Sequence, residues 1–106
     1  MESKAESYDI LDAVSGTKWE RVFEYENADG SPVDLSDFTP RGEIRDDDDN
    51  LLETLNFVVV GNKVTVSFTP ATIYRGDYDI ELVPTAGDPI YFVGGRVRVK
   101  RGITQP

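Results

Sequence analysis

Acid–base chemistry in this chain would have to come from carboxylates, lysines or tyrosines, because the sequence contains neither histidine nor cysteine. The most regular set of carboxylates is Asp77, Asp79 and Glu81, which alternate with apolar residues in 77–82. Alternate residues of a strand share one face, so these carboxylates are predicted to line an outward, solvated face rather than a dry cleft. We therefore expect no catalytic residues and no enzymatic activity.

A second acidic group is the run of four aspartates from Asp46 to Asp49, followed by Asn50. Four adjacent carboxylates would lose too much hydration inside a core, so the run predicts the exposed tip of a hairpin. A calcium loop of the EF type also needs a glycine and a distant glutamate at fixed positions, and both are missing here. We predict no metal or cofactor site, and cation binding by the turn at 46–49 stays open as the alternative.

Basic side chains gather near the end of the sequence, at Arg96, Arg98, Lys100 and Arg101. Because the formal net charge is −9, the chain lacks the cationic balance that binding to nucleic acid or to an anionic membrane requires. Arg96, Arg98 and Lys100 share one strand face, which is predicted to be solvated or to face a partner; a phosphate-binding patch is the alternative. We take these three residues as candidate interface residues.

Tyr74 and Tyr91 are the aromatic residues predicted to lie off the inward faces of their strands. Carbohydrate sites place exposed aromatic rings beside carboxylates, so both tyrosines are candidates for a glycan-binding surface. The alternative is that each ring lies at a protein interface or a sheet edge, where tyrosine is common. Both are counted as candidate interface residues.

The elements that must position these side chains are strands, because apolar residues recur at every second position. In 18–26, Trp19, Phe23 and Tyr25 share one parity while charged residues occupy most of the other, which indicates a half-buried strand. The same pattern predicts strands in 8–14, 41–45, 63–68 and 78–83, one or two more in 51–60, and a last one in 90–99.

Turn residues separate these segments. Asp29-Gly30 supplies the positive φ of a reversing loop, and Gly61-Asn62 is typical of a two-residue hairpin. After the first of these turns, Leu35 and Phe38 are predicted to close one end of the core. Residues 70–73 are predicted to cross between strands, with one helical turn capped by Thr69 as an option.

Two glycine positions predict local detail. Gly42 faces inward in its strand, which indicates a bulky neighbour, and Trp19 is the candidate. In the last strand, Ile90 and Phe92 lie at even positions, whereas Val97 and Val99 lie at odd ones. The inward face must therefore switch parity, and a β-bulge is predicted at Gly94-Gly95.

The strand count and spacing indicate an all-β fold. We predict an antiparallel immunoglobulin-like β-sandwich of seven to eight short strands, with a small barrel as the alternative. At 106 residues the chain is expected to be one domain, 1–106, with a core in about 7–100 and polar terminal segments at 1–6 and 101–106. The polar amino terminus, MESKAESYD, is not expected to be a secretory signal.

The order of these motifs over about residues 16–100 resembles small β-sandwich domains of tailed-bacteriophage virion proteins, including the amino-terminal domain of baseplate upper proteins. Part of the resemblance lies in GDYDIEL at 76–82 and in GRVRV at 95–99. The other matching residues are Asp29, Gly30, Pro32, Val33, Asp34, Leu35, Ser36, Phe38, Ile44, Arg45, Asp46, Leu51 and Leu52.

The resemblance implies a non-enzymatic structural protein of a tailed-phage virion, made in the host cytoplasm. Such a protein would dock onto a head, neck, tail or baseplate partner, with several copies in a symmetric assembly. The terminal segments, residues 1–7 and 102–106, are further interface candidates. A carbohydrate or host-surface binding module is the alternative function.

Overall fold

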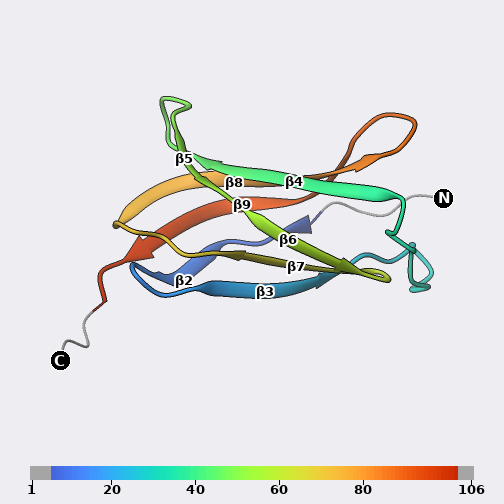
Figure 1. The fold of residues 1–106 in the computed structure, drawn as a ribbon, viewed down its shortest axis with the longest axis horizontal. Coiled ribbons are helices and arrows are strands. Elements are labelled where there is room, and N and C mark those ends of the chain that lie inside the picture. Colours follow the sequence, from blue (N-terminus) through green and yellow to red (C-terminus); the bar gives the residue numbers. More distant parts are fainter. Residues whose placement is uncertain (1–5, 103–106) are drawn as a thin grey trace.

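The structure, a computed structural model, describes residues 6–102, which form nine strands joined by turns (Figure 1). No helix occurs among these residues. The strands are β1 (Glu6–Ser7), β2 (Ile10–Val14), β3 (Trp19–Glu24), β4 (Phe38–Arg45), β5 (Leu51–Thr54), β6 (Asn56–Val60), β7 (Lys63–Phe68), β8 (Tyr74–Pro84) and β9 (Ile90–Lys100). Each strand segment expected from the period of two overlaps at least one of them.

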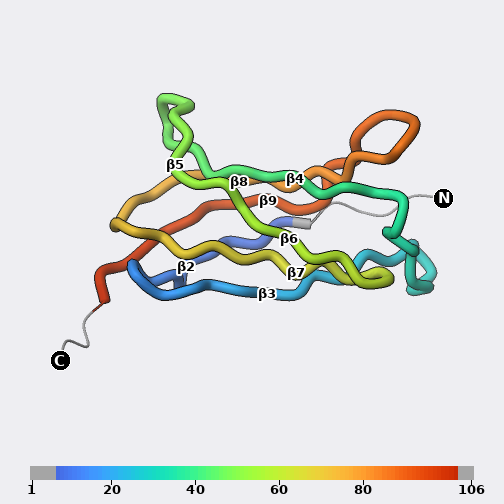
Figure 2. Tube along the Cα trace, in the orientation of Figure 1, coloured from blue at the N-terminus to red at the C-terminus, as the bar shows by residue number. Residues whose placement is uncertain are grey.

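The strands form two sheets that face each other, as the tube in Figure 2 shows. The larger sheet has the order β1-β9-β8-β4-β5, with β2 also on β9, and the smaller one has the order β3-β7-β6. All pairs are antiparallel except those of β1 and β2, which run parallel to β9. β1 and β2 follow one another along β9, so they are the halves of one interrupted strand. The all-β immunoglobulin-like sandwich is thereby confirmed.

The core lies between the sheets and is filled from their inner faces. Trp19, Phe23 and Tyr25 are buried, as the period of two predicts, and Leu35 is fully buried at one end. The rings of Tyr25 and Phe92 meet edge to face at 5.3 Å, which joins the two layers. No charged or polar side chain among the described residues belongs to this buried set. Burial of apolar surface is therefore what holds the sheets together.

Gly42 faces the core as expected, but the side chains that cover it are those of Ile80 and Leu55 and not that of Trp19. A Cβ on Gly42 would lie 2.7 Å from the Asp79 carbonyl oxygen and 3.3 Å from Leu55. Leu55 lies between β5 and β6, where the chain passes from the larger sheet to the smaller one, and only 4% of it is exposed. The expectation for Trp19 was wrong because its strand does not face β4 at this level; its ring packs on Phe68 instead.

β9 does switch the parity of its inward residues, but the bulge precedes the predicted glycines. Ile80 pairs with Val93, whereas Glu81 pairs with Tyr91, so Phe92 is the extra residue. Phe92 and Val93 are both buried. An aromatic residue can occupy this bulge because its ring packs against the core rings of β3 and of the loop after it, so glycine is not needed there.

Gly94 and Gly95 serve close approach instead. A Cβ on Gly95 would overlap the carbonyl oxygen of Tyr8 and lie 2.7 Å from Asp9 Oδ1, and one on Gly94 would overlap the hydroxyl of Tyr91. The segment between β1 and β2 is thus held directly against β9. The Tyr8 amide donates a hydrogen bond to the Gly94 carbonyl at 3.0 Å.

Three element boundaries differ from the expectation. β4 begins at Phe38 rather than at 41, and Pro40 is tolerated inside it because β5 pairs only with residues 43–45 and leaves this part as an edge. β8 begins at Tyr74 rather than at 78, so Arg75-Gly76-Asp77 belongs to the strand. Residues 69–73 do cross from the smaller to the larger sheet, but they form no helical turn.

The expected contacts of the chain ends fall mostly on residues 1–5 and 103–106, which lie outside the described residues. Within residues 6–102, no helix has the length and apolar character needed to cross a membrane.

Candidate docking surface

The candidate basic residues lie together on the outer face of β9. Arg96, Arg98 and Lys100 are all exposed and alternate with the buried Val97 and Val99, as predicted. A fourth cation joins them, because Arg75 of β8 pairs directly with Arg98 in the sheet. Sequence reasoning missed Arg75 because it expected this strand to begin at residue 78. We call Arg75, Arg96, Arg98 and Lys100 the basic face.

The pairing of Arg75 with Arg98 is the unusual feature of this surface. Residues directly opposite each other in an antiparallel pair have Cβ atoms roughly 5 Å apart, and like charges in that position destabilise the sheet. No side chain of the basic face makes an ion pair with another described residue. Asp77 lies opposite Arg96 in the sheet but forms no ion pair with it, and Arg75 and Arg98 have only each other across the strand pair.

The neighbouring part of the same sheet differs, since its charges are paired. Arg41 Nη2 lies 2.7 Å from Glu81 Oε1, and Arg45 Nη2 lies 2.6 Å from Glu43 Oε1. All four side chains are well exposed, so water screens these pairs and each contributes little to stability. Their consequence is chemical: β4 presents charges that pair with one another or with Glu81, whereas β9 and the start of β8 present four cations and one acidic residue, Asp77, which lies opposite Arg96.

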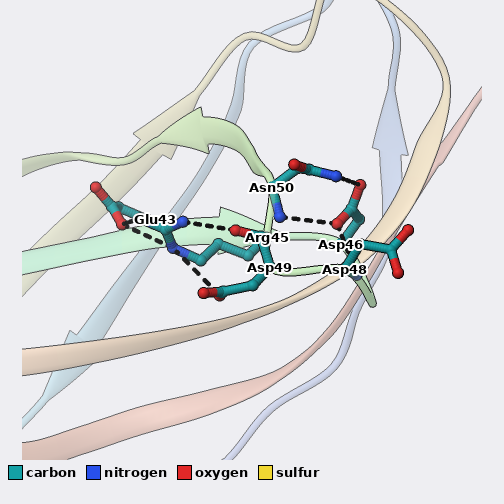
Figure 3. Close-up of polar contacts among 6 residues, drawn as sticks. All are labelled: Glu43, Arg45, Asp46, Asp48, Asp49 and Asn50. Atoms are coloured by element: carbon teal, nitrogen blue, oxygen red, sulfur yellow. Dashed lines mark hydrogen bonds and ion pairs between the residues drawn. The ribbon is translucent and has the colours of Figure 1, made fainter.

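The acidic run forms the tip of the β4–β5 hairpin, as predicted (Figure 3). Asp46 organises it: its Oδ1 accepts hydrogen bonds from the amides of Asp48 and Asn50, both at 2.9 Å. Asp49 has a positive φ of 65°, and its carbonyl oxygen accepts a hydrogen bond from Arg45 Nη1 at 2.8 Å. Among the described residues, no three acidic side chains gather in a way that could hold a metal ion.

An open hollow of about 720 Å³ separates this tip from the basic face. Asp46, Asp47 and Asp48 of the tip line it together with Arg75, Arg96 and Arg98, and Asp77 of β8 lies among these cations. Leu11 of β2 adds an apolar side chain that is 49% exposed. Sequence reasoning did not single out Leu11; the available signal was its place off the inward parity of the buried Ile10. A partner here would meet cations, one apolar side chain and an acidic border.

The two candidate tyrosines do not form a common platform. Tyr74 lies opposite Val99 and Tyr91 lies opposite Glu81, so seven residues of β8, or roughly 23 Å, separate their positions. Tyr74 was wrongly placed off the inward parity: it shares the face of Tyr78, is half-buried, and donates a hydrogen bond to Glu53 at 3.2 Å. Burial is the main cause that raises the pKa of Tyr74, and the negative charge of the Glu53 carboxylate adds to it. Tyr91 is exposed, as expected.

The pKa of Asp46 provides a test of the tip. The main cause that holds this pKa below its ordinary value is a hydrogen bond from the Asn50 amide, and a second hydrogen bond from the Asn50 side chain adds to it. A depressed pKa contributes stability that is present above the ordinary carboxyl pKa and is lost as the pH falls through the folded value. Replacing Asn50 with alanine should raise the Asp46 pKa, as an NMR titration of the side-chain carboxyl carbon would show.

Asp29 is the internal control for that titration. Hydrogen bonds from Ser31 lower its pKa, and Asn50 plays no part in them. The Asp29 midpoint should therefore be the same in both proteins. An Asp46 midpoint that stays in place after Asn50→Ala would show that the Asn50 side chain does not contribute to the lowered pKa.

Comparisons with known proteins support the fold but identify no family. No family model matches the chain, and no curated protein matches its sequence. A solved structure of an endo-fucoidan hydrolase from glycoside hydrolase family 107 is similar, with a TM-score of 0.58 and 13% identity over 92% of this chain. The chain spans 13% of the length of that hydrolase. At this identity, the likeness concerns the fold alone.

Two further matches are separate domains of similar size. The Lin-41 filamin domain has a TM-score of 0.49 and 18% identity, over 89% of this chain and 84% of the filamin domain. The ASH/PapD-like domain of human CEP192 has a TM-score of 0.46 and 13% identity, over 98% of this chain and 86% of that one.

Proposed function

We propose that this chain is a non-enzymatic structural protein of a tailed-phage virion, and that it docks through its basic face onto an acidic surface of a head, neck, tail or baseplate partner. The observation that carries the docking surface is the direct pairing of Arg75 with Arg98 on an exposed face. Two unpaired cations side by side are unfavourable in the isolated domain, and a carboxylate supplied by a partner would turn repulsion into charge-assisted hydrogen bonds.

The net charge of the chain supports the same partner chemistry. With a formal net charge of −9, the protein repels other acidic proteins at long range, whereas the four cations of the basic face attract them at close range. Such an arrangement keeps the free protein soluble and favours docking onto an acidic partner through the basic face, where opposite charges meet. Several copies around a symmetric particle would then present the same face to identical partner sites.

The virion role rests on the resemblance of residues 16–100 to phage β-sandwich domains, and those residues have clear architectural parts in the fold. Gly30 has a positive φ of 89° in the turn before Leu35. Leu35 is fully buried, and its carbonyl oxygen accepts a hydrogen bond from the Phe38 amide at 3.0 Å. The matching residues therefore have structural roles in closing the sandwich, whereas the basic face is the surface proposed to bind a partner.

Arg98→Glu separates docking from folding. The new carboxylate would lie opposite Arg75, and such an opposite-charge pair contributes roughly 0.2–1 kcal/mol to stability, so the domain should fold at least as well as the original. Docking should weaken by roughly tenfold or more, because the replaced cation would repel the acidic partner. The measurement is the amount of this protein per particle, by quantitative mass spectrometry of particles assembled from the phage genome that encodes it.

Lys18→Glu is the matched control. It changes the net charge by the same amount, and Lys18 is an exposed residue in the turn before β3 that is not part of the basic face and pairs with Glu20 at 3.4 Å. Particles should contain this variant at the original level. Absence of the unsubstituted protein from purified particles would refute the virion role, and equal incorporation of the Arg98→Glu variant would refute the basic face as the docking surface.

A further inference from the structure

β6 is an exposed sheet edge without protection. It ends the smaller sheet, its only strand partner is β7, and its residues Asn56–Val60 include no charge and no proline (Figure 1). Its register with β7 continues without a bulge over all five pairs. Charges, prolines, bulges and shortness are the features by which proteins prevent their sheet edges from pairing with other chains. None of them is present in β6.

The other edges of the described sheets do have such features. β3, at the opposite edge of the smaller sheet, carries Glu20, Arg21 and Glu24. In the larger sheet, β5 has four residues and an irregular register with β4, and the uncovered half of β4 contains Pro40. β1 has two residues and is separated from β2 by a break. The contrast singles out β6 as the edge that can accept another strand.

The backbone groups that β6 offers can be assigned from its hairpin. Gly61-Asn62 forms a two-residue loop, and Val60 pairs with Lys63, so this pair exchanges both backbone hydrogen bonds. Alternation then assigns Val58 and Asn56 to the bonded pairs with β7. The amide and carbonyl groups of Phe57 and Val59 therefore point away from β7, toward the free edge.

We propose that β6 pairs antiparallel with β6 of a second copy of this chain, about a two-fold axis at Val58. In that register Phe57 lies opposite Val59 of the second copy and exchanges both hydrogen bonds with it, and the symmetric pair does the same. All four free groups of each strand are then used. Val58 lies opposite Val58 of the second copy, in a pair without hydrogen bonds, where the side chains come closest. Two three-stranded sheets become one six-stranded sheet.

Charge selects this edge for self-pairing. Each chain has a net charge of −9, so two copies can only meet where acidic residues do not oppose one another. In the Val58-centred register every position of β6 faces an uncharged residue, and the two ends place Asn56 opposite Val60. The same operation on β3 would place the charged side chains Glu20, Arg21 and Glu24 in the new strand pair.

Exposed valines extend the contact beyond the backbone. Val58 and Val60 are 61% and 71% exposed on the outer face of the sheet. Pairing would bring four of these side chains, two from each copy, into one apolar row and remove part of it from water. Pairing along five residues buries much less area than a standard interface of roughly 1,600 Å², so we expect a concentration-dependent equilibrium rather than a permanent dimer.

The first test is the mass of the isolated protein in solution, by sedimentation equilibrium. The apparent mass should rise from 11.8 kDa toward twice that value with increasing protein concentration. Salt should strengthen the association, because at about 0.5 M the Debye length is well below 10 Å and the repulsion between the two acidic chains is screened. A monomer at millimolar concentration in high salt would overturn the proposal.

Val58→Lys tests the assigned axis, since it opposes two ammonium groups at the centre of the pair while the side chain stays on an exposed face. This variant should remain monomeric under the conditions that dimerise the original protein. Val22→Lys is the control: Val22 is 50% exposed on the same face, but it lies on β3, across the sheet from the β6 edge. It should dimerise as the original does. Equal association of the Val58→Lys variant would overturn the register.

Amide hydrogen exchange gives a residue-level readout. The Phe57 and Val59 amides should exchange quickly in dilute solution and slowly in the dimer, whereas the Val58 amide, bonded to β7, should be protected in both. Protection that does not depend on concentration would overturn the assignment of the free groups. These measurements use the protein alone, so they are independent of virion docking, and either proposal can fail without the other.

Discussion

Replacing Phe68 with alanine is expected to lower the free energy of unfolding by about 3–5 kcal/mol. Phe68 ends β7 with 1% of its surface exposed, and its ring lies 5.6 Å from that of Trp19. Truncation removes the transfer free energy of the ring and leaves a cavity between two sheets whose strand pairing prevents them from closing around it. A domain of this size has a total stability of roughly 5–15 kcal/mol, so the loss takes up a large part of it.

Urea denaturation followed by fluorescence measures this loss, because Trp19 is the only tryptophan. The midpoint should fall, with a similar dependence of the unfolding free energy on urea concentration. Val58→Ala is the control on the neighbouring strand: its side chain is 61% exposed, and we expect a change within about 0.5 kcal/mol. Similar midpoints for the Phe68→Ala variant and the original protein would contradict the position of the core.

Replacing Gly95 with alanine is the second change with a large expected effect, and it acts on the amino-terminal strand. The new Cβ would overlap the Tyr8 carbonyl oxygen, which is backbone and cannot rotate away. Moving that backbone breaks the hydrogen bond that Tyr78 Oη donates to Tyr8 at 2.6 Å and the one from the Arg96 amide to Asp9 at 3.0 Å. At about 0.5–1.5 kcal/mol for each hydrogen bond, the loss should be roughly 1–3 kcal/mol before any apolar exposure is counted.

The effect should be local, and two probes can show this. Trp19 Nε1 donates a hydrogen bond to Asp12 of β2 at 2.9 Å, so displacement of β2 should shift the tryptophan emission to longer wavelength. The amides of β2 should exchange faster, while those of β7 keep their protection. Arg96→Ala, which truncates an exposed neighbour, should leave both probes unchanged. Unchanged emission and exchange in the Gly95→Ala variant would show that β1 and β2 are not held by this contact.

Several features of this protein follow from the sequence because they depend on local chemistry. The period of two in 18–26 and 63–68 predicts which side chains are buried, and the structure confirms Trp19, Phe23 and Tyr25. Four adjacent aspartates cannot be dehydrated, so their place at a hairpin tip also follows from composition. The exposure of Arg96, Arg98 and Lys100 is of the same kind, since alternation with buried valines determines it.

Other features depend on which strands become neighbours, and no local pattern contains that information. The sequence predicts an irregularity in β9, but its position at Phe92 follows from the aromatic rings of β3 and of the loop after it that pack there. Gly42 predicts covering side chains, but only the crossing from β5 to β6 makes Leu55 one of them. Tyr74 was misplaced because β8 begins earlier than its most regular part indicates.

The same division applies to the two surfaces proposed for docking. The sequence by itself determined that β9 would present a row of cations and that β6 would carry no charge. Only the tertiary structure placed Arg75 opposite Arg98 and left β6 at the end of its sheet, because strand order and register are set by long-range packing of the two layers. The type of a residue determines which groups it can bind. The neighbours that the fold places beside it determine whether those groups are already paired within the chain or are free to bind a partner.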